Sequence, residues 1–210
     1  MIKPDTLRAA EAHLRERDPR LAPLIDAHGP CTMGAKRRDP FHVLCSSIIS
    51  QQLSIKAADT IQARIAVATG ASRRLTPAHL IAADHEQLRA CGLSNAKARW
   101  LRELAEAAAC GRLDFARLKK LDDEAAIAAL DALPGIGRWT AEMFLIFALD
   151  RLDLFSLGDV GLRNGLNRLH GGGDRLDDQT ALAITARWAP YRSVGSWYLW
   201  RIADNTAIGG

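Results

Sequence analysis

The chain has 210 residues, of which 48% are hydrophobic and 25% charged, and its formal net charge is +4. This length can bury a substantial core, and the composition is that of an ordinary globular protein, which excludes a disordered or fibrous chain. The mild positive charge is compatible with a polyanionic partner but does not demonstrate one.

The N-terminal stretch 1–18 is charged throughout and lacks the apolar run of a secretory signal peptide. No segment approaches the roughly 18 apolar residues that span a bilayer, so we expect a cytoplasmic protein without a membrane partner. The four cysteines are widely spaced, which predicts free thiols and no iron–sulfur cluster. They are Cys31, Cys45, Cys91 and Cys110.

The composition favours helices, because alanine occurs 36 times and valine only four times. Asp39-Pro40 and Thr76-Pro77 each resemble a helix N-cap followed by proline at the first helical position. Ser94–Cys110 shows helical periodicity, with Ser94 as N-cap and Gly111 as terminator.

Further helices are predicted along the rest of the chain. One begins at Asp122 and Asp123 and is stopped by Leu133-Pro134-Gly135. Another ends near His170, before a loop formed by the three glycines 171–173. The whole pattern predicts roughly ten to twelve short helices, no strand and therefore an all-α fold.

The segment 133–141, LPGIGRWTA, is a sharp turn between two helices. Gly135 and Gly137 let the backbone approach another surface and adopt conformations barred to larger residues. Their N–H groups and those of the following helix suit a phosphate oxygen. Contacts of this kind hold a nucleic-acid backbone without reading its sequence. A Gly-x-Gly between helices is also compatible with a simple tight turn.

The fuller pattern resembles the second half of the helix-hairpin-helix motif of base-excision DNA glycosylases, the HhH-GPD superfamily. The resemblance implies DNA contacts by Gly135, Gly137, Arg138 and Thr140. It also implies that the carbonyls of Asp131, Leu133 and Ile136 hold a structural Na⁺ or K⁺, with no other cofactor required. Resemblance to the superfamily extends from about Phe41 to Asp204 and includes the pair Arg192-Ser193, for which we expect a structural role.

Asp159, in LFSLGDVGLRNGL, stands where superfamily members place an essential aspartate. A fixed carboxylate beside C1′ would stabilise the positive charge that develops on the sugar and would orient or deprotonate the attacking water. Taken alone, Asp159 is an ordinary helix N-cap, and the two roles are compatible.

Trp139 indicates the branch of the family. Lyase-type relatives carry a lysine nucleophile at this position, so the resemblance implies a monofunctional enzyme that leaves an abasic site. In the DNA-3-methyladenine glycosylase II group a tryptophan here lines the base pocket, and Trp200 matches a second pocket aromatic. Aromatic walls favour cationic alkylated purines. Met143 stands where a well-known branch has a further aromatic. Both tryptophans are also compatible with core packing.

The segment 46–58, SSIISQQLSIKAA, resembles the turn with which the family probes the minor groove. Gln52 is the first candidate for the side chain that fills the gap left by a flipped base, Leu53 is the second, and Gln51 is a neighbouring contact. The alternative is a plain helix junction with Ser54 as N-cap. Lys56 and Lys97 are possible phosphate contacts.

The resemblance implies two helical lobes around a DNA-binding cleft. Residues 41–149 form the central lobe with the hairpin, and residues 1–40 plus 150–210 form the lobe that carries Asp159. The expected partner is double-stranded DNA with a damaged base, bound by a monomer that is associated with the nucleoid if bacterial. The alternatives are a glycosylase for another lesion, such as uracil, and a non-catalytic helix-hairpin-helix module that binds damaged DNA.

Overall fold

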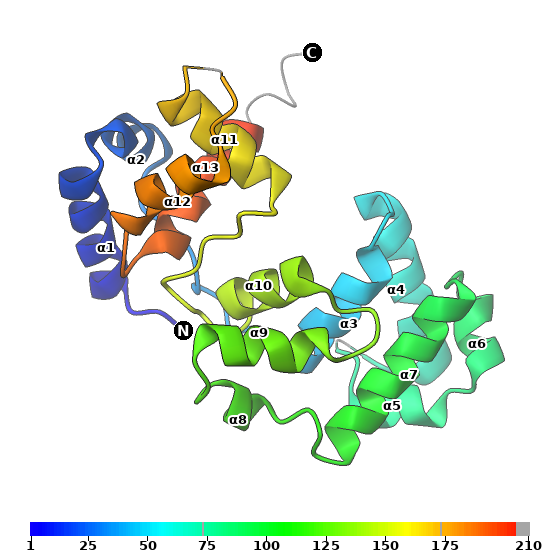
Figure 1. The fold of residues 1–210 in the computed structure, drawn as a ribbon. Coiled ribbons are helices and arrows are strands. Elements are labelled where there is room, and N and C mark those ends of the chain that lie inside the picture. The colour runs from blue at the N-terminus through cyan, green and yellow to red at the C-terminus, as the bar shows by residue number, and fades with distance from the viewer. Residues whose placement is uncertain (73, 173, 205–210) are drawn as a thin grey trace. The chain divides into compact units, whose positions relative to one another are not determined.

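The computed structural model describes residues 1–72, 74–172 and 174–204, and throughout these ranges the regular structure is helical (Figure 1). Thirteen α-helices and one 3-10 turn occur in this part of the chain, which confirms the all-α prediction. The first half contains α1 (Pro4–Arg17), η1 (Pro19–Leu21), α2 (Ala22–His28), α3 (Pro40–Ser50), α4 (Ile55–Thr69), α5 (Pro77–Ala82), α6 (His85–Ala90) and α7 (Asn95–Ala109). The second half contains α8 (Phe115–Leu118), α9 (Asp123–Asp131), α10 (Arg138–Phe147), α11 (Val160–His170), α12 (Asp178–Ala186) and α13 (Arg192–Asp204).

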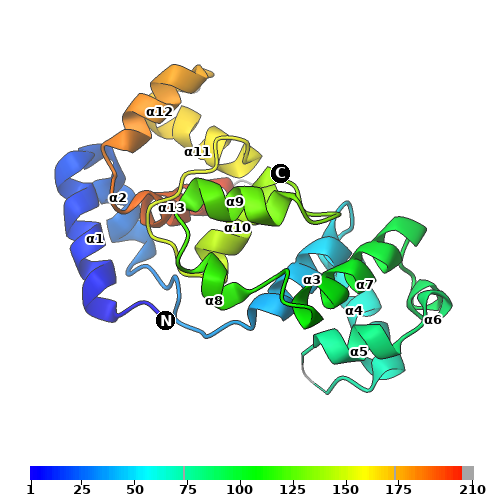
Figure 2. The same ribbon diagram turned by 60° about the horizontal axis from the view of Figure 1, so that its bottom comes forward.

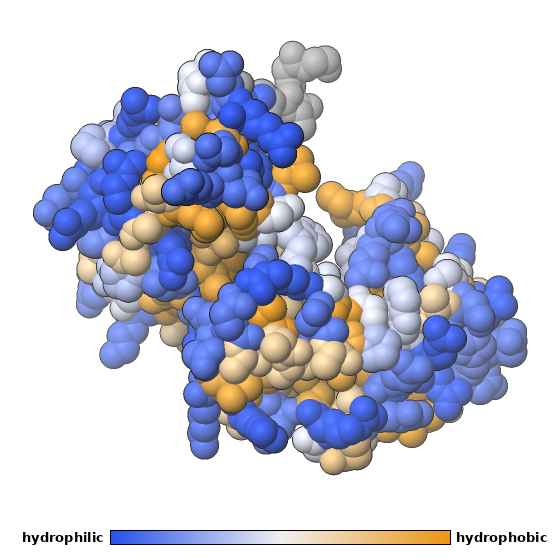
Figure 3. All heavy atoms as spheres, viewed as in Figure 1, coloured by the Kyte–Doolittle hydropathy of each residue, from blue (hydrophilic) through white to orange (hydrophobic). Residues whose placement is uncertain are grey.

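The helices group into two compact units. Met1–Arg37 and Leu145–Gly210 form the first unit, and Arg38–Phe144 form the second. The boundary after Phe144 falls inside α10. Hydrophilic side chains cover much of the surface seen in Figure 3, with hydrophobic side chains exposed among them.

The first unit is built around the pair α11 and α13, which lie side by side (Figure 1). Gly165 of α11 permits this packing, because a Cβ added there would lie 2.9 Å from the Leu199 carbonyl oxygen of α13. Val194, Tyr198 and Leu199 of α13 are fully buried beneath the neighbouring helices. The α11–α13 pair therefore supports any group at the start of α11.

A buried polar cluster joins the remote parts of the first unit. Asp18, only 2% exposed, accepts a hydrogen bond from Trp188 Nε1 at 2.8 Å and pairs with His170 Nε2 at 2.9 Å. Burial alone raises the pKa of Asp18, but the hydrogen bonds from His170 and Trp188 outweigh burial and hold this pKa below its ordinary value.

The second unit packs α3, α4, α5, α6 and α7 around aliphatic side chains. Leu44, Ile48, Ile65, Leu80 and Leu101 are each fully buried there. Figures 1 and 2 both show α9 beside the start of α10, with the hairpin joining them.

The helix starts agree with the capping signals of the sequence. Asp39 accepts from the His42 N–H at 2.9 Å, Ser94 accepts from the Lys97 N–H at 3.2 Å, and Thr76 and Asp122 also act as N-caps. The helix predicted to be stopped by Leu133-Pro134-Gly135 ends at Asp131, with Ala132 as its C-cap directly before that segment. Residue 173 of the predicted glycine loop lies outside the described residues.

The four cysteines are free thiols: Cys31, Cys45 and Cys91 are buried, whereas Cys110 is exposed. Burial raises the pKa of Cys31 to about 11. In residues 1–72, 74–172 and 174–204, no helix is long and apolar enough to cross a membrane. The same residues include no cluster of three or more histidine, cysteine or acidic side chains arranged to hold a metal ion.

Candidate active site and nucleic-acid interface

Asp159 is the N-cap of α11, and two N–H donors hold its carboxylate. Oδ1 accepts from the Leu162 main chain at 2.8 Å and from Trp200 Nε1 at 3.0 Å. The side chain is nearly buried, at 8% exposure. A carboxylate at a helix N-terminus is stabilised by the helix dipole as well as by these donors. The structure therefore places a fixed negative charge at the start of α11.

Trp200 lies on α13 and contacts Asp159. Its indole also lies beside Phe147 and Gly161. The Phe147 ring lies against the indole, with 5.2 Å between centroids and 35° between planes. Gly161 leaves space for the Asp159 carboxylate and the Trp200 indole, because a Cβ at position 161 would lie 3.2 Å from both Asp159 Oδ1 and Trp200 Cδ1. Sequence reasoning missed Phe147 and Gly161. Phe147 follows Met143 by one helical turn, and that spacing is the signal that could have revealed it.

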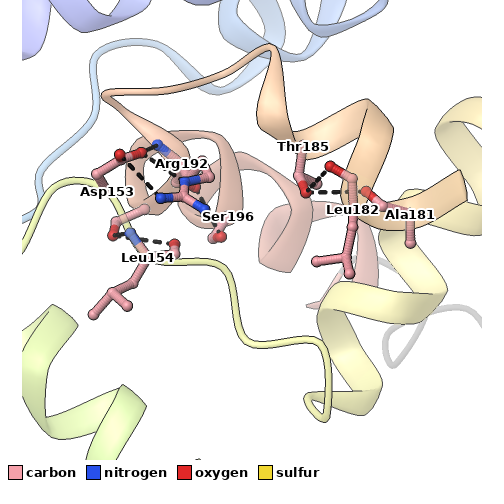
Figure 4. Close-up of polar contacts among 8 residues, drawn as sticks. Asp153, Leu154, Ala181, Leu182, Thr185, Arg192 and Ser196 are labelled. Carbon is pink, nitrogen blue, oxygen red and sulfur yellow. Dashed lines mark hydrogen bonds and ion pairs between the residues drawn. The ribbon is translucent and has the colours of Figure 1, made fainter. Parts of the chain in front are cut away.

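The segment that leads to Asp159 is tied to the start of α13 (Figure 4). Arg192 donates from Nε and Nη2 to the two Asp153 carboxylate oxygens at 2.8 and 3.1 Å. Ser193 Oγ accepts from the Leu154 N–H at 2.9 Å and donates to the Leu154 carbonyl at 3.2 Å. The pair Arg192-Ser193 thus holds this segment against α13, which gives the pair a structural role. Asp153, the partner of Arg192, was not singled out by the sequence.

The hairpin loop, residues 133–137, turns sharply between α9 and α10. Gly135 has a φ of +82°, and a Cβ added there would lie 2.6 Å from the Trp100 ring. Gly137 does not share this conformation, and nothing lies within 4 Å of its added Cβ. The expectation of special backbone conformations at both glycines is therefore wrong for Gly137, because one left-handed residue is enough to make the turn.

The start of α10 presents main-chain N–H groups. At the start of this helix the Ala141 N–H donates to the Gly137 carbonyl at 3.0 Å. The N–H groups in the first turn of an α-helix have no intrahelical acceptor, so a helix start of this kind suits an anion. The Thr140 side chain is buried, at 6% exposure, so its main chain is the part suited to a DNA contact.

Arg138 lies between two carboxylates. Its guanidinium donates to both Glu124 oxygens at 2.9 and 2.6 Å and to Glu142 at 3.0 Å. The hydrogen bond with Glu124 is the main reason that the pKa of Arg138 lies above its ordinary value. The ion pair joins the first turn of α9 to the first turn of α10.

Trp139 and Trp200 belong to different units and have different surroundings. The Trp139 side chain is 50% exposed, unlike a tryptophan buried in the core, whereas Met143 is half-buried. Trp200 is half-buried against Phe147 and Asp159. Core packing thus does not account for Trp139.

The probing turn, residues 51–54, joins α3 to α4. Gln52 has a φ of +58°, a left-handed conformation that is uncommon outside glycine. Gln52 is exposed and Leu53 is 40% exposed, while Ser54 caps α4. Ile55, which sequence reasoning missed, is 83% exposed. Exposed apolar side chains beside a strained turn suit insertion between bases.

Gln51 and Lys97 point to partners within the second unit. Gln51 Nε2 donates to the Gly135 carbonyl at 2.7 Å. Lys97 Nζ donates to the carbonyls of Ile49 and Gln51 at 2.8 and 2.6 Å. Lys56 is exposed at the start of α4.

The fold and these sites agree with one protein family. The family model described as HhH-GPD superfamily base excision DNA repair protein matches residues 45–190. The chain belongs to this superfamily. The assignment made from LPGIGRWTA and Asp159 is thereby confirmed.

Several relatives of this HhH-GPD protein carry the name DNA-3-methyladenine glycosylase or glycosidase. The chain is 34% identical over 208 residues to DNA-3-methyladenine glycosylase 1 of Schizosaccharomyces pombe, covering 96% of this chain and 91% of that one. It is similar to the crystal structure of a DNA-3-methyladenine glycosidase from Bacillus halodurans, with a TM-score of 0.86, 38% identity and coverage of 95% and 91%. It also resembles the S. pombe enzyme Mag1 in complex with abasic DNA, with a TM-score of 0.76, 34% identity and coverage of 93% and 97%.

Proposed function

We propose that this HhH-GPD protein is a monofunctional DNA glycosylase that excises alkylated purines of the 3-methyladenine and 7-methylguanine type. The observation that carries the proposal is the Asp159 carboxylate, fixed by Leu162 and Trp200 at the start of α11. The partner is double-stranded DNA that contains a damaged base, bound by a monomer in the cytoplasm, where it is associated with the nucleoid if the source is bacterial.

Asp159 is the catalytic residue of this proposal. As the bond from C1′ to the base nitrogen breaks, the base leaves with the bonding electron pair and positive charge develops on the sugar. The Asp159 carboxylate stabilises that charge and orients the attacking water. The water oxygen bonds to C1′ and the water proton passes to the carboxylate, so the products are the free base and an abasic site.

Trp139 supports a hydrolytic rather than a lyase reaction. An amine nucleophile would form a Schiff base with the sugar and lead to strand cleavage. An indole cannot form that bond, and the intact strand is the expected product.

Aromatic side chains support the choice of substrate. Trp139, Trp200 and Phe147 offer π-faces, and Met143 adds a polarizable, adaptable side chain. An alkylated purine carries positive charge, which is attracted to aromatic faces. The same positive charge makes the base a good leaving group, so one carboxylate suffices without a separate general acid.

DNA would be held by the hairpin loop and probed by the turn between α3 and α4. The N–H groups of Gly135, Gly137 and the start of α10 bind phosphate, with Arg138 beside them. Gln52 or Leu53, with Ile55, fills the space of the flipped nucleotide.

The end of α9 suits a monovalent cation. The carbonyls of Asp131, Leu133 and Ile136 are neutral oxygen donors, and those at a helix end lack a full set of intrahelical partners. The Leu133 carbonyl accepts one hydrogen bond, from Ile136 N–H at 3.1 Å, and keeps a second lone pair. A bound Na⁺ or K⁺ would add positive charge beside the phosphate site.

The decisive test replaces Asp159 with asparagine, which keeps the size and the cap but removes the charge. We expect Asp159→Asn to lose base release by a factor of about a thousand, since electrostatic stabilisation of this kind is typically worth 10²–10³ or more. Binding to DNA with an abasic-site analogue, measured by fluorescence anisotropy, should persist. A variant that releases bases at the wild-type rate would exclude Asp159 as the catalytic residue. A wild-type protein that binds this DNA but releases no base would leave a non-catalytic binding module as the better description.

The substrate class is tested separately by mass spectrometry. The protein is incubated with methylated genomic DNA and the released bases are identified. We expect 3-methyladenine and 7-methylguanine, with intact strands until base or amine is added. Release of uracil alone would assign another lesion, and spontaneous strand cleavage would contradict the monofunctional mechanism.

A further inference from the structure

The probing turn and the hairpin loop are far apart in sequence but are joined directly. The Gln51 side-chain amide donates to the Gly135 carbonyl at 2.7 Å, across 84 positions of the chain. Gln51 is half-buried, whereas the next residue, Gln52, is exposed. The two neighbouring glutamines therefore differ: Gln51 turns toward the protein and Gln52 toward solvent.

Lys97 holds the same turn from α7. Its ammonium group donates to the carbonyls of Ile49 and Gln51 at 2.8 and 2.6 Å, at the C-terminal end of α3. Carbonyls at a helix C-terminus lack intrahelical donors and carry partial negative charge, so a cation stabilises them. Burial lowers the pKa of Lys97, in keeping with an ammonium group partly withdrawn from solvent.

Trp100, one turn after Lys97 on α7, supports the hairpin loop. The Gly135 Cα lies so close to the indole that a Cβ would approach Trp100 Cε3 to 2.6 Å. Helix α7 thus contacts the probing turn through Lys97 and the hairpin loop through Trp100. Gln51 completes the connection between the two loops.

We propose that Gln51, Lys97 and Trp100 are positioning residues that hold the probing turn and the hairpin loop as one DNA-recognition surface. This inference rests on the proposed glycosylase function. Flipping a base out of a paired duplex costs the free energy of unstacking and unpairing that base. That cost is offset when phosphate binding and insertion act on the same stretch of DNA at the same time. Gln51 acts in this process through Gly135, and Lys97 acts through the end of α3 rather than as a phosphate contact.

The test uses Gln51→Glu, which keeps the size but replaces the N–H donor with a carboxylate that faces a carbonyl. We expect excision of 7-methylguanine from a fully paired duplex to fall about tenfold. Excision from a single strand, or opposite a mismatch, should stay within about twofold of wild type, because extrusion costs least there. Gln51→Met, which lacks the donor without adding charge, should show the same selective loss.

Gln179→Glu is the matched control, since it makes the same chemical change at an exposed position of α12. It should leave both rates unchanged. Equal losses on paired and unpaired substrates, or no loss on either, would overturn the coupling. Thermal unfolding of each variant separates these outcomes from a failure to fold.

Two binding measurements test the coupling between the probing turn and the hairpin loop without relying on base release. Gln51→Glu should reduce the preference for DNA with an abasic-site analogue over undamaged DNA. Lys97→Met should leave the slope of log affinity against log salt unchanged, whereas removal of a phosphate contact lowers that slope by about one. A lowered slope would assign Lys97 to DNA after all. If wild type released no alkylated base while these binding effects held, the proposed function would fail and the coupling would stand.

Discussion

At the scale of single residues, the helix cap at Asp159 fixes the carboxylate for which we propose a catalytic role. The capping bond from Leu162 fixes the carboxylate, and the indole N–H of Trp200 adds a second donor to the same oxygen. The cap is a local signal that the sequence shows. The indole contact joins residues 41 positions apart, and only the packing of α11 on α13 creates it.

Trp200→Phe tests the indole donor apart from the aromatic face. Phenylalanine keeps an aromatic ring beside Phe147 but removes the N–H from Asp159. Hydrogen bonds to charged groups are worth about 1.5–3 kcal/mol, so we expect the single-turnover rate of base release to fall about tenfold to a hundredfold. Affinity for undamaged DNA, measured by anisotropy, should change little.

Trp197→Phe on the same helix is the matched control. Trp197 packs against Tyr198 and under the Arg201 guanidinium, 4.3 Å from the ring centroid. Loss of its N–H leaves the Asp159 carboxylate untouched, so the rate should stay near wild type. Equal losses in the two variants would show that aromatic packing of α13, not the donor, sets the rate.

At the scale of elements, the hairpin loop shows that two glycines in one motif serve different needs. Gly135 is required by its left-handed backbone and by the approach of Trp100. Gly137 stands in open space, where an added side chain would meet no part of the protein within 4 Å. The fold of the loop therefore requires glycine at position 135, whereas no packing in the protein requires it at position 137.

Gly135→Ala and Gly137→Ala should separate these two effects. A methyl group at 135 overlaps the Trp100 ring in an unfavourable backbone conformation, so we expect a loss of about 1–3 kcal/mol in unfolding free energy. Gly137→Ala should cost less than about 1 kcal/mol but still weaken DNA binding. Urea denaturation and anisotropy measure the two quantities. A Gly135→Ala protein as stable as wild type would contradict the close packing.

The sequence could predict features that depend on neighbouring residues, but not those that depend on how helices pack. Caps at Asp39, Ser94 and Asp159 depend on residues three or four positions apart, and a sequence displays them directly. The Gln51–Gly135 and Arg192–Asp153 contacts depend on how helices pack, and no local pattern shows them. The roles assigned to Trp139 and Asp159 came from family resemblance rather than from physical necessity.

At the scale of the whole molecule, stability depends on polar groups buried far from the proposed chemistry. Asp18, at the N-cap of η1, meets Trp188 after α12 and His170 at the end of α11. These contacts join segments up to 170 positions apart. A buried carboxylate thus connects distant segments of the first unit.

Asp18→Asn should make the protein less stable at neutral pH and remove part of its sensitivity to acid. Because the folded-state pKa of Asp18 is lowered, its contribution is present above the unfolded value of about 4 and is lost as pH falls through the folded value. We expect a loss of about 1–3 kcal/mol at pH 7 that shrinks below pH 4. Denaturant unfolding between pH 3 and 7 measures it, and a constant difference would contradict this linkage.

The uneven exposure of the four thiols makes the native chain suitable for labelling at one site. Arg112 donates to Cys110 Sγ at 3.3 Å and is among the causes of its lowered pKa, while burial raises the pKa of the other three thiols. A maleimide dye should therefore attach to Cys110 alone under native conditions. In denaturant the adduct count in intact-mass spectra should rise to four, so a brief pulse of reagent would report transient opening of the chain.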